Sequence, residues 1–296
     1  MSFDNAYEAL TAAEPDGESR WAFGTGFDDP LSGVDTALPA DVDGVEFSRY
    51  LLMLGDDALI ASHRLTEWVT RAPELEDELA LANIALDLLG QARLLLARAG
   101  QADGTGRGED ELAYFRDERE FRNVRLVEPP NGDFAQSIAR LLVFSTWRLA
   151  LFSRLAESRD PVLAAIAAKG IKELAYHREY AAQWTVRLGD GTEVSKERMQ
   201  QGLDEVWPLV GELFVRHETE LRMTEAGVGV DPADVRAEFD DVIDQVCAAA
   251  TLQLPDRQAL AGVGGRAGRD GIHTEHLGYL LAEMQSLARA HPEATW

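Results

Sequence analysis

Residues 73–100 read PELEDELALANIALDLLGQARLLLARAG, and this stretch indicates the fold most clearly. It begins with proline and acidic residues and ends in glycine, the order expected at the two ends of an α-helix. Apolar residues dominate its interior, where Asn83, Asp87 and Gln91 fall one turn apart on a single stripe. We therefore predict one helix of about 40 Å, at about 1.5 Å per residue.

Three more stretches predict helices of similar length, over residues 46–70, 133–157 and 161–188. Asp133 is a good N-cap, and proline follows Asp160 at the start of the last of these helices. Strand-like alternation of apolar and polar residues is not sustained anywhere. Four helices of this length suit a four-helix bundle, so we predict an all-α fold.

The remaining sequence predicts additions on both sides of that bundle. Further helices are expected after it, over residues 195–226 with a bend at Pro208, 232–252 and 274–290. Residues 1–43 are acidic, aperiodic and rich in glycine, proline and alanine, so we predict a flexible N-terminal extension there. Residues 44–296 form a single helical domain on this interpretation.

The charge is strongly negative, with 52 acidic and 28 basic residues and a formal net charge of −24. Because the acids are spread along the chain, we interpret them as adaptation to a salty cytoplasm, with docking of a basic partner as the alternative. This charge argues against binding nucleic acid or an anionic membrane. Cys247 is the only cysteine and the N-terminus lacks a signal peptide, so we predict a cytoplasmic protein without internal disulfides.

A bundle of this size raises the question of a carboxylate-bridged di-iron centre. Such a site needs one carboxylate from each of two helices and a Glu-x-x-His pair from each of the other two. Residues 134–156 contain no Asp, Glu or His, and Glu173 and His177 are four residues apart instead of three. The other acidic or histidine candidates are Asp56, Asp57, His63, Glu67 and Asp87. The ligand set is incomplete, and we predict no metal, cofactor or catalytic residue in this chain.

Carboxylates that point into the bundle would still need charge compensation, since an isolated buried charge is costly. If Asp57, Asp87 and Glu173 face the interior, Arg140 and Arg148 on the third helix are placed to supply it. This hypothesis predicts a hydrogen bond from one of the arginines to one of the three carboxylates. The alternative is that most of these groups lie on solvated faces.

Two other motifs give weaker signals. His273 and His276 are spaced like a pair of metal ligands, but no third ligand is evident. Residues 262–265 read GVGG, follow no strand and lack the lysine of a P-loop, so they give little support for a phosphate site. The sequence also lacks the Gly-x-Ser-x-Gly pattern of a nucleophile elbow.

Several long stretches resemble the C subunits of phenylacetyl-CoA epoxidases. The matching stretches are LANIALDLLGQAR (81–93), DEREFRN (117–123), PNGDFA (130–135), RLGDGT (187–192) and HTEHLGYLLAEM (273–284). They occur in the same order as in that family, and the resemblance extends from about residue 46 to the end of the chain.

The resemblance implies a ferritin-like, non-catalytic subunit paired with a catalytic homologue that carries the di-iron centre. Together with a reductase component, such a complex uses oxygen to epoxidise the ring of phenylacetyl-CoA. In the catalytic relatives the second helix carries Asp-Glu-x-x-His and the fourth carries Glu-Glu-x-x-His. The matching positions here, interpreted as remnants of an iron site, are Asp87, Leu88, Gln91, Glu173, Leu174 and His177, with Asp57 on the first helix. On both helices leucine stands where the family places a ligand glutamate.

Two other functions stay open at this point. The chain is an active di-iron oxygenase or oxidase if Asp57, Asp87, Glu173 and His177 build an irregular metal site. It is a free-standing helical homo-oligomer if it has no affinity for a di-iron homologue.

Overall fold

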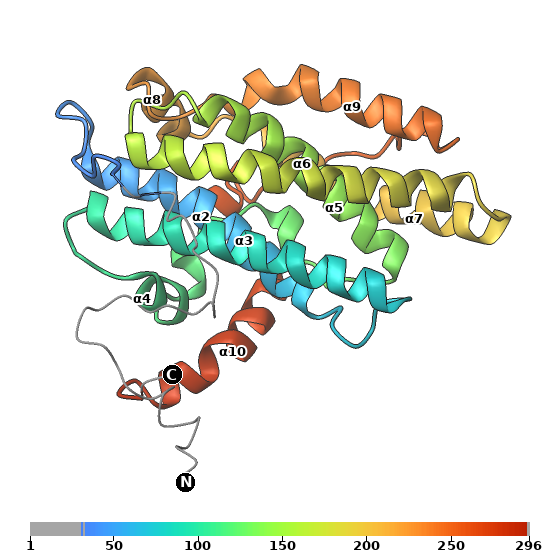
Figure 1. Cartoon of the computed structure of the whole chain (residues 1–296), viewed down its shortest axis with the longest axis horizontal. Coiled ribbons are helices and arrows are strands. Elements are labelled where there is room, and N and C mark those ends of the chain that lie inside the picture. The colour runs from blue at the N-terminus through green and yellow to red at the C-terminus, as the bar shows by residue number, and fades with distance from the viewer. Residues whose placement is uncertain (1–30, 32, 295–296) are drawn as a thin grey trace, which may run out of the picture.

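The computed structural model describes residues 31 and 33–294, and its centre is a bundle of four long helices. These are α2 (Gly44–Thr66), α3 (Leu75–Ala102), α5 (Phe134–Leu155) and α6 (Pro161–Gly189), seen together in Figure 1. In the bundle α2 packs on α3, α5 packs on α6, and α3 packs on α6. No strand forms among the described residues, apart from one isolated bridge. The predicted all-α fold is therefore confirmed.

Three of the four bundle helices begin at an aspartate that caps them. Asp43, Asp133 and Asp160 each accept hydrogen bonds from backbone amides of the first turn, at 2.8–3.1 Å. An aspartate at this position satisfies amides that have no partner within the helix. The cap predicted at Asp133 is confirmed, and the helix predicted to start after Asp160 does so.

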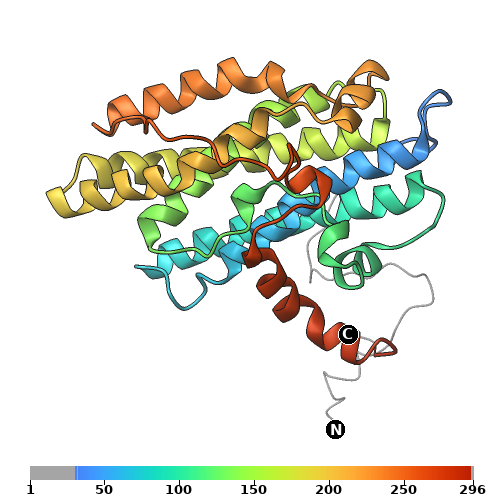
Figure 2. The same cartoon turned by 180° about the vertical axis from the view of Figure 1, so that it is seen from behind.

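Shorter elements surround the bundle on one side and at its ends. They are α4 (Glu109–Tyr114), α7 (Glu193–Val210), α8 (Glu218–Glu225), α9 (Arg236–Ala249) and α10 (Glu275–Ala290), joined by 3₁₀ turns and loops. Helix α7 packs on α5 and α6, as does α9. Figure 2 shows α7 and the following loops lying across the side of the bundle opposite to the one that faces the viewer in Figure 1. Helix α10 projects away from the bundle and packs on α4.

The helix predicted over residues 195–226 is in fact two helices. The bend was expected at Pro208, but α7 continues past it and the chain breaks at the 3₁₀ turn Gly211–Phe214. Within that turn the buried carboxylate of Glu212 bonds to an arginine and to a backbone amide of other segments. His217 then caps the start of α8. The break therefore lies after the proline, at a turn that tertiary contacts of Glu212 hold in place.

Residues 33–43 lie against the helical body. The carbonyl of Thr36 accepts a hydrogen bond from Arg98 Nη1 at 2.7 Å, and several apolar side chains of this segment pack on the core. Residues 1–30 and 32, where most of the flexible extension was predicted, lie outside the described residues.

Helices α3 and α5 differ in how far they are covered. In α5, 18 of 22 residues are buried, because α6, α7 and α9 surround it. Helix α3 is the one described helix long and apolar enough to cross a membrane, a property that it shares with the core helices of many bundles. Only 44% of its most apolar window is buried, so α3 presents apolar residues to the outside.

Candidate functional site in the bundle centre

Four of the predicted remnant positions meet where α3 and α6 face each other. Asp87 Oδ2 lies 3.0 Å from His177 Nε2, and the amide of Gln91 donates to Glu173 Oε2 at 2.9 Å. Since higher numbers on α3 pair with lower numbers on α6, the two helices run antiparallel. The structure thus brings together four of the positions that the resemblance implies are remnants of an iron site, and that origin stays a prediction.

A buried arginine completes this cluster. Arg148 Nε donates to the side-chain oxygen of Gln91 at 3.0 Å, and Arg148 Nη1 donates to the carbonyl of Leu54 at 3.2 Å. Its guanidinium carbon lies 4.3 Å from the centre of the Phe152 ring, a distance suited to a cation–π contact. Burial lowers the pKa of Arg148 to about 10, which still leaves the group positively charged at neutral pH. A permanent cation therefore lies at the centre of the cluster.

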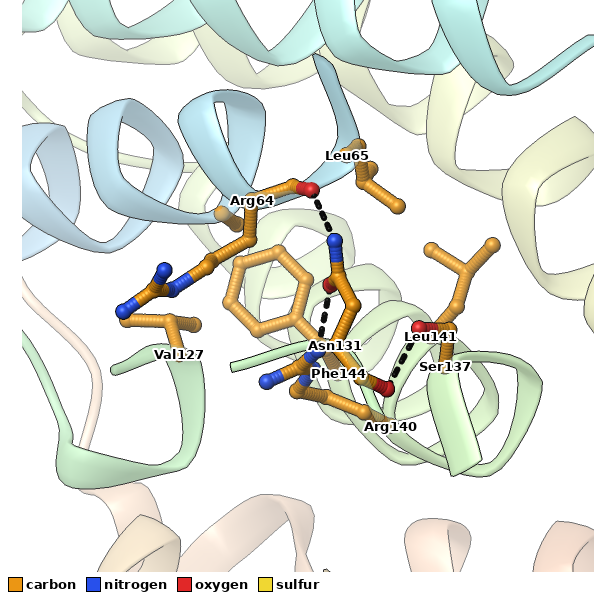
Figure 3. Close-up of a pocket in the computed structure, with 9 residues that line it drawn as sticks. Arg64, Leu65, Val127, Asn131, Ser137, Arg140, Leu141 and Phe144 are labelled. Atoms are coloured by element: carbon orange, nitrogen blue, oxygen red, sulfur yellow. Dashed lines mark hydrogen bonds between the residues drawn. The ribbon is translucent and has the colours of Figure 1, made fainter. Parts of the chain in front are cut away.

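The predicted hydrogen bond from an arginine to a remnant carboxylate is wrong for both arginines. Arg148 reaches Glu173 only through Gln91, whose amide group accepts from the arginine and donates to the carboxylate. Arg140 lies elsewhere, where it donates to the side chain of Asn131 beside a cavity of about 20 Å³ (Figure 3). Burial lowers the pKa of Arg140 to about 10 as well.

Asp57 lies apart from this cluster, and an arginine from a segment distant in the sequence neutralises its charge. Arg269 donates to its two carboxylate oxygens at 2.9 and 3.0 Å, and the backbone amide of Val124 donates at 2.8 Å. Burial raises the pKa of Asp57, and the paired guanidinium opposes this shift. Glu220 lies 3.9 Å from Arg269 Nε, and burial raises the pKa of Glu220 to about 7.

Glu173 is a partly buried remnant carboxylate with two partners in this chain. Burial raises its pKa, while the hydrogen bond from Gln91 and the charge of Lys169 act in the opposite direction. Lys169 Nζ lies 3.6 Å from the carboxylate. Glu173 is thus already engaged by two groups of this chain.

These residues do not fit a di-iron centre. Leu88 and Leu174, at the positions where the family resemblance places ligand glutamates, are apolar and 0% exposed. The cation of Arg148 would repel a metal ion in the same space. In the part of the chain that the structure describes, no group of three or more His, Cys, Asp or Glu side chains is arranged to hold a metal ion.

His273, the first histidine of the pair near the start of α10, has a structural role. His273 Nδ1 lies 2.7 Å from Glu128 Oε1, and His273 Nε2 lies 3.1 Å from the carbonyl of Phe121. The other oxygen of Glu128 accepts from Thr274 at 2.6 Å. These buried bonds fasten the start of α10 to the loop before α5 and leave neither ring nitrogen of His273 available to a metal.

The family of phenylacetic acid catabolic proteins matches residues 35–296 of this sequence. The chain belongs to this family. It is similar to the C subunit of the 1,2-phenylacetyl-CoA epoxidase of Escherichia coli (strain K12), with 49% identity over 251 residues. The matched region covers 85% of this chain and 99% of that relative. The resemblance found in the sequence is thereby confirmed, while the salt adaptation stays a prediction.

The cations that neutralise the buried acids Asp56 and Asp57 of this phenylacetic acid catabolic protein could not be predicted from its sequence. Arg269 binds Asp57, and Arg116 Nη1 donates to Asp56 at 3.0 Å, yet both arginines come from segments remote in sequence. No local spacing rule connects such partners. The only available signal was the presence of two adjacent acids, Asp56 and Asp57, within an otherwise apolar helix.

Proposed function

We propose that this chain is a structural, non-catalytic subunit of a multicomponent phenylacetyl-CoA epoxidase of the cytoplasm. A homologous helical subunit would hold the di-iron centre, and a reductase component would supply it with electrons. The observation that carries the proposal is the bond from Arg148 to Gln91, which puts a buried cation of this chain among the remnant ligand positions. The buried leucines at positions 88 and 174 support it further.

The job of such a subunit is mechanical. Hydrogen bonds between polar side chains inside a bundle help to fix the relative position of its helices. Here the pairs Asp87–His177 and Gln91–Glu173 tie α3 to α6, and Arg148 ties α5 to α3 and to α2. A bundle held in this way is a firm support for a neighbouring subunit whose own helices must keep metal ligands in place.

An active oxygenase with an irregular ligand set is less well supported. It would need Asp57, Asp87, Glu173 and His177 around one metal. Asp57 is instead paired with Arg269, and Glu173 accepts a hydrogen bond from Gln91.

Iron content tests the proposal. We would measure it by elemental analysis on the purified chain alone and on the chain co-expressed with its di-iron homologue. The expected result is no stoichiometric iron in the isolated chain and a di-iron centre in the co-purified pair. Iron bound stoichiometrically to the isolated chain would favour the active oxygenase. A stable homo-oligomer with no affinity for the homologue would favour the free-standing assembly.

A further inference from the structure

One face of the bundle carries apolar side chains that the described part of the chain leaves uncovered. On α3, Leu75, Leu79 and Leu86 are 66%, 57% and 53% exposed, and they fall on one stripe at spacings of four and seven residues. On the neighbouring helix α6, Tyr176 is 49% exposed. Figure 1 looks onto α3 and α6, which lie side by side in front of α2 and α5. We call this surface, marked by these four residues, the α3–α6 face.

The α3–α6 face is preformed. At one end, Asp77 accepts hydrogen bonds from the Tyr180 hydroxyl and the Trp184 indole, both at 2.9 Å. In the middle, Asp87 and His177 are in contact at 3.0 Å, and each directly follows an exposed member of the face in sequence. Because both helices are already fixed, a partner that binds here does not have to order them, which reduces the free-energy cost of association.

The acidic character of the chain is interrupted on the same two helices. Residues 79–102 of α3 contain a single acid, Asp87, although the chain as a whole has 52 acids. Helix α6 carries four basic residues and two acidic ones, and its bases include two of the three lysines of the chain, Lys169 and Lys172. Along residues 79–102 of α3 exposed leucine therefore lies among few charges, as in the centre of a subunit interface, whereas the end of the face at Leu75 is acidic, with Glu74 and Glu76 on either side of it.

We propose that the α3–α6 face is the surface on which the homologous di-iron subunit docks, an inference that rests on the proposed function. A pair of helices about 40 Å long and about 20 Å across offers about 800 Å², the area that each partner contributes to an ordinary stable interface. A second copy of this chain fits the surface less well, because each copy carries a net charge of −24 and the two would repel one another. An anionic lipid surface meets the same repulsion.

Co-purification of the full-length chain with its di-iron homologue tests this surface. Leu86→Glu puts a charge at the centre of the face, and we expect it to weaken binding of the homologue at least tenfold. Leu287→Glu on α10 is the matched control, because that leucine is 56% exposed on a helix that packs on α4, and its binding should match that of wild type within about twofold. Circular dichroism of both variants checks that they are folded.

A photo-crosslinking side chain at position 79, in the otherwise unchanged chain, identifies what covers the face in the co-purified complex. A crosslink to the di-iron homologue supports the proposal. Crosslinks only to a second copy, only to residues 1–30 of the same chain, or capture by anionic vesicles would overturn it. If wild type binds the homologue and Leu86→Glu binds equally well, the docking face is wrong but the proposed function stands. If wild type does not bind the homologue at all, both fail.

Discussion

Arg269→Met gives the sharpest test of how buried charges stabilise this bundle. The guanidinium of Arg269 donates to Asp57 at 2.9 and 3.0 Å and to the backbone carbonyls of Met53 and Arg122 at 3.0 and 2.8 Å. Methionine fills much of the same space but leaves a completely buried carboxylate without its cation. We expect the free energy of unfolding to fall by about 3–5 kcal/mol, the usual loss when one partner of a buried ion pair is removed.

Urea and thermal unfolding followed by circular dichroism measure this loss. At about 2–4 °C per kcal/mol, the melting temperature should fall by about 6–20 °C. Arg257→Met is the control, since Arg257 pairs with Asp204 on the surface and should cost less than about 1 kcal/mol. The double variant Arg269→Met/Asp57→Asn should lose less unfolding free energy than the two single variants lose together, by at least about 2 kcal/mol. Strictly additive losses, or a loss below about 1 kcal/mol for Arg269→Met, would refute the reasoning.

Three further predictions concern the interior. Glutamates placed at positions 88 and 174 (Leu88→Glu with Leu174→Glu) should give no stoichiometric iron by elemental analysis while Arg148 is present, and bound iron would contradict the repulsion argued here. Burial raises the pKa of Glu220 from 4.5 to about 7, so its contribution of about 3 kcal/mol is fully present below pH 4.5 and is lost as the pH rises through 7. Glu220→Gln should flatten the curve of unfolding free energy against pH between pH 4.5 and about 7. An unchanged curve would show that another group causes this pH dependence. Gly170→Ala puts a Cβ of α6 2.7 Å from the ring of Phe152 on α5, and the free energy of unfolding in urea should fall by about 1–3 kcal/mol. Unchanged stability would show that α5 and α6 move apart easily.

The helices could be predicted because their signals are local. Asp43, Asp133 and Asp160 each cap a helix by bonding to amides within three residues of themselves. Apolar spacing then gives the length of each helix without knowledge of its neighbours. The same reasoning failed at the turn Gly211–Phe214, where the contacts of Glu212 with distant segments end α7.

The centre of the candidate site could be predicted only in part. Spacings of four residues put Asp87 with Gln91, and Glu173 with His177, on single helix faces, while only the family resemblance grouped the two pairs into one site. It also put Arg148 on the right helix, but helical periodicity does not distinguish a direct contact with a carboxylate from one that passes through an amide. The two arrangements differ in the distance between the arginine and the carboxylate by about the length of one side chain. The packing between the helices determines which of them forms.

The pair Asp57–Arg269 also has a consequence for the order of events during synthesis. The two residues are 212 positions apart in the sequence. At about 5–20 residues per second, Asp57 leaves the ribosome about 10–40 s before its partner exists. Until then the first bundle helix carries an unpaired acid on a surface that must be buried, so it cannot settle permanently against its neighbours. Completion of the native bundle, and with it any assembly that requires a finished bundle, is therefore timed by the last tenth of the chain.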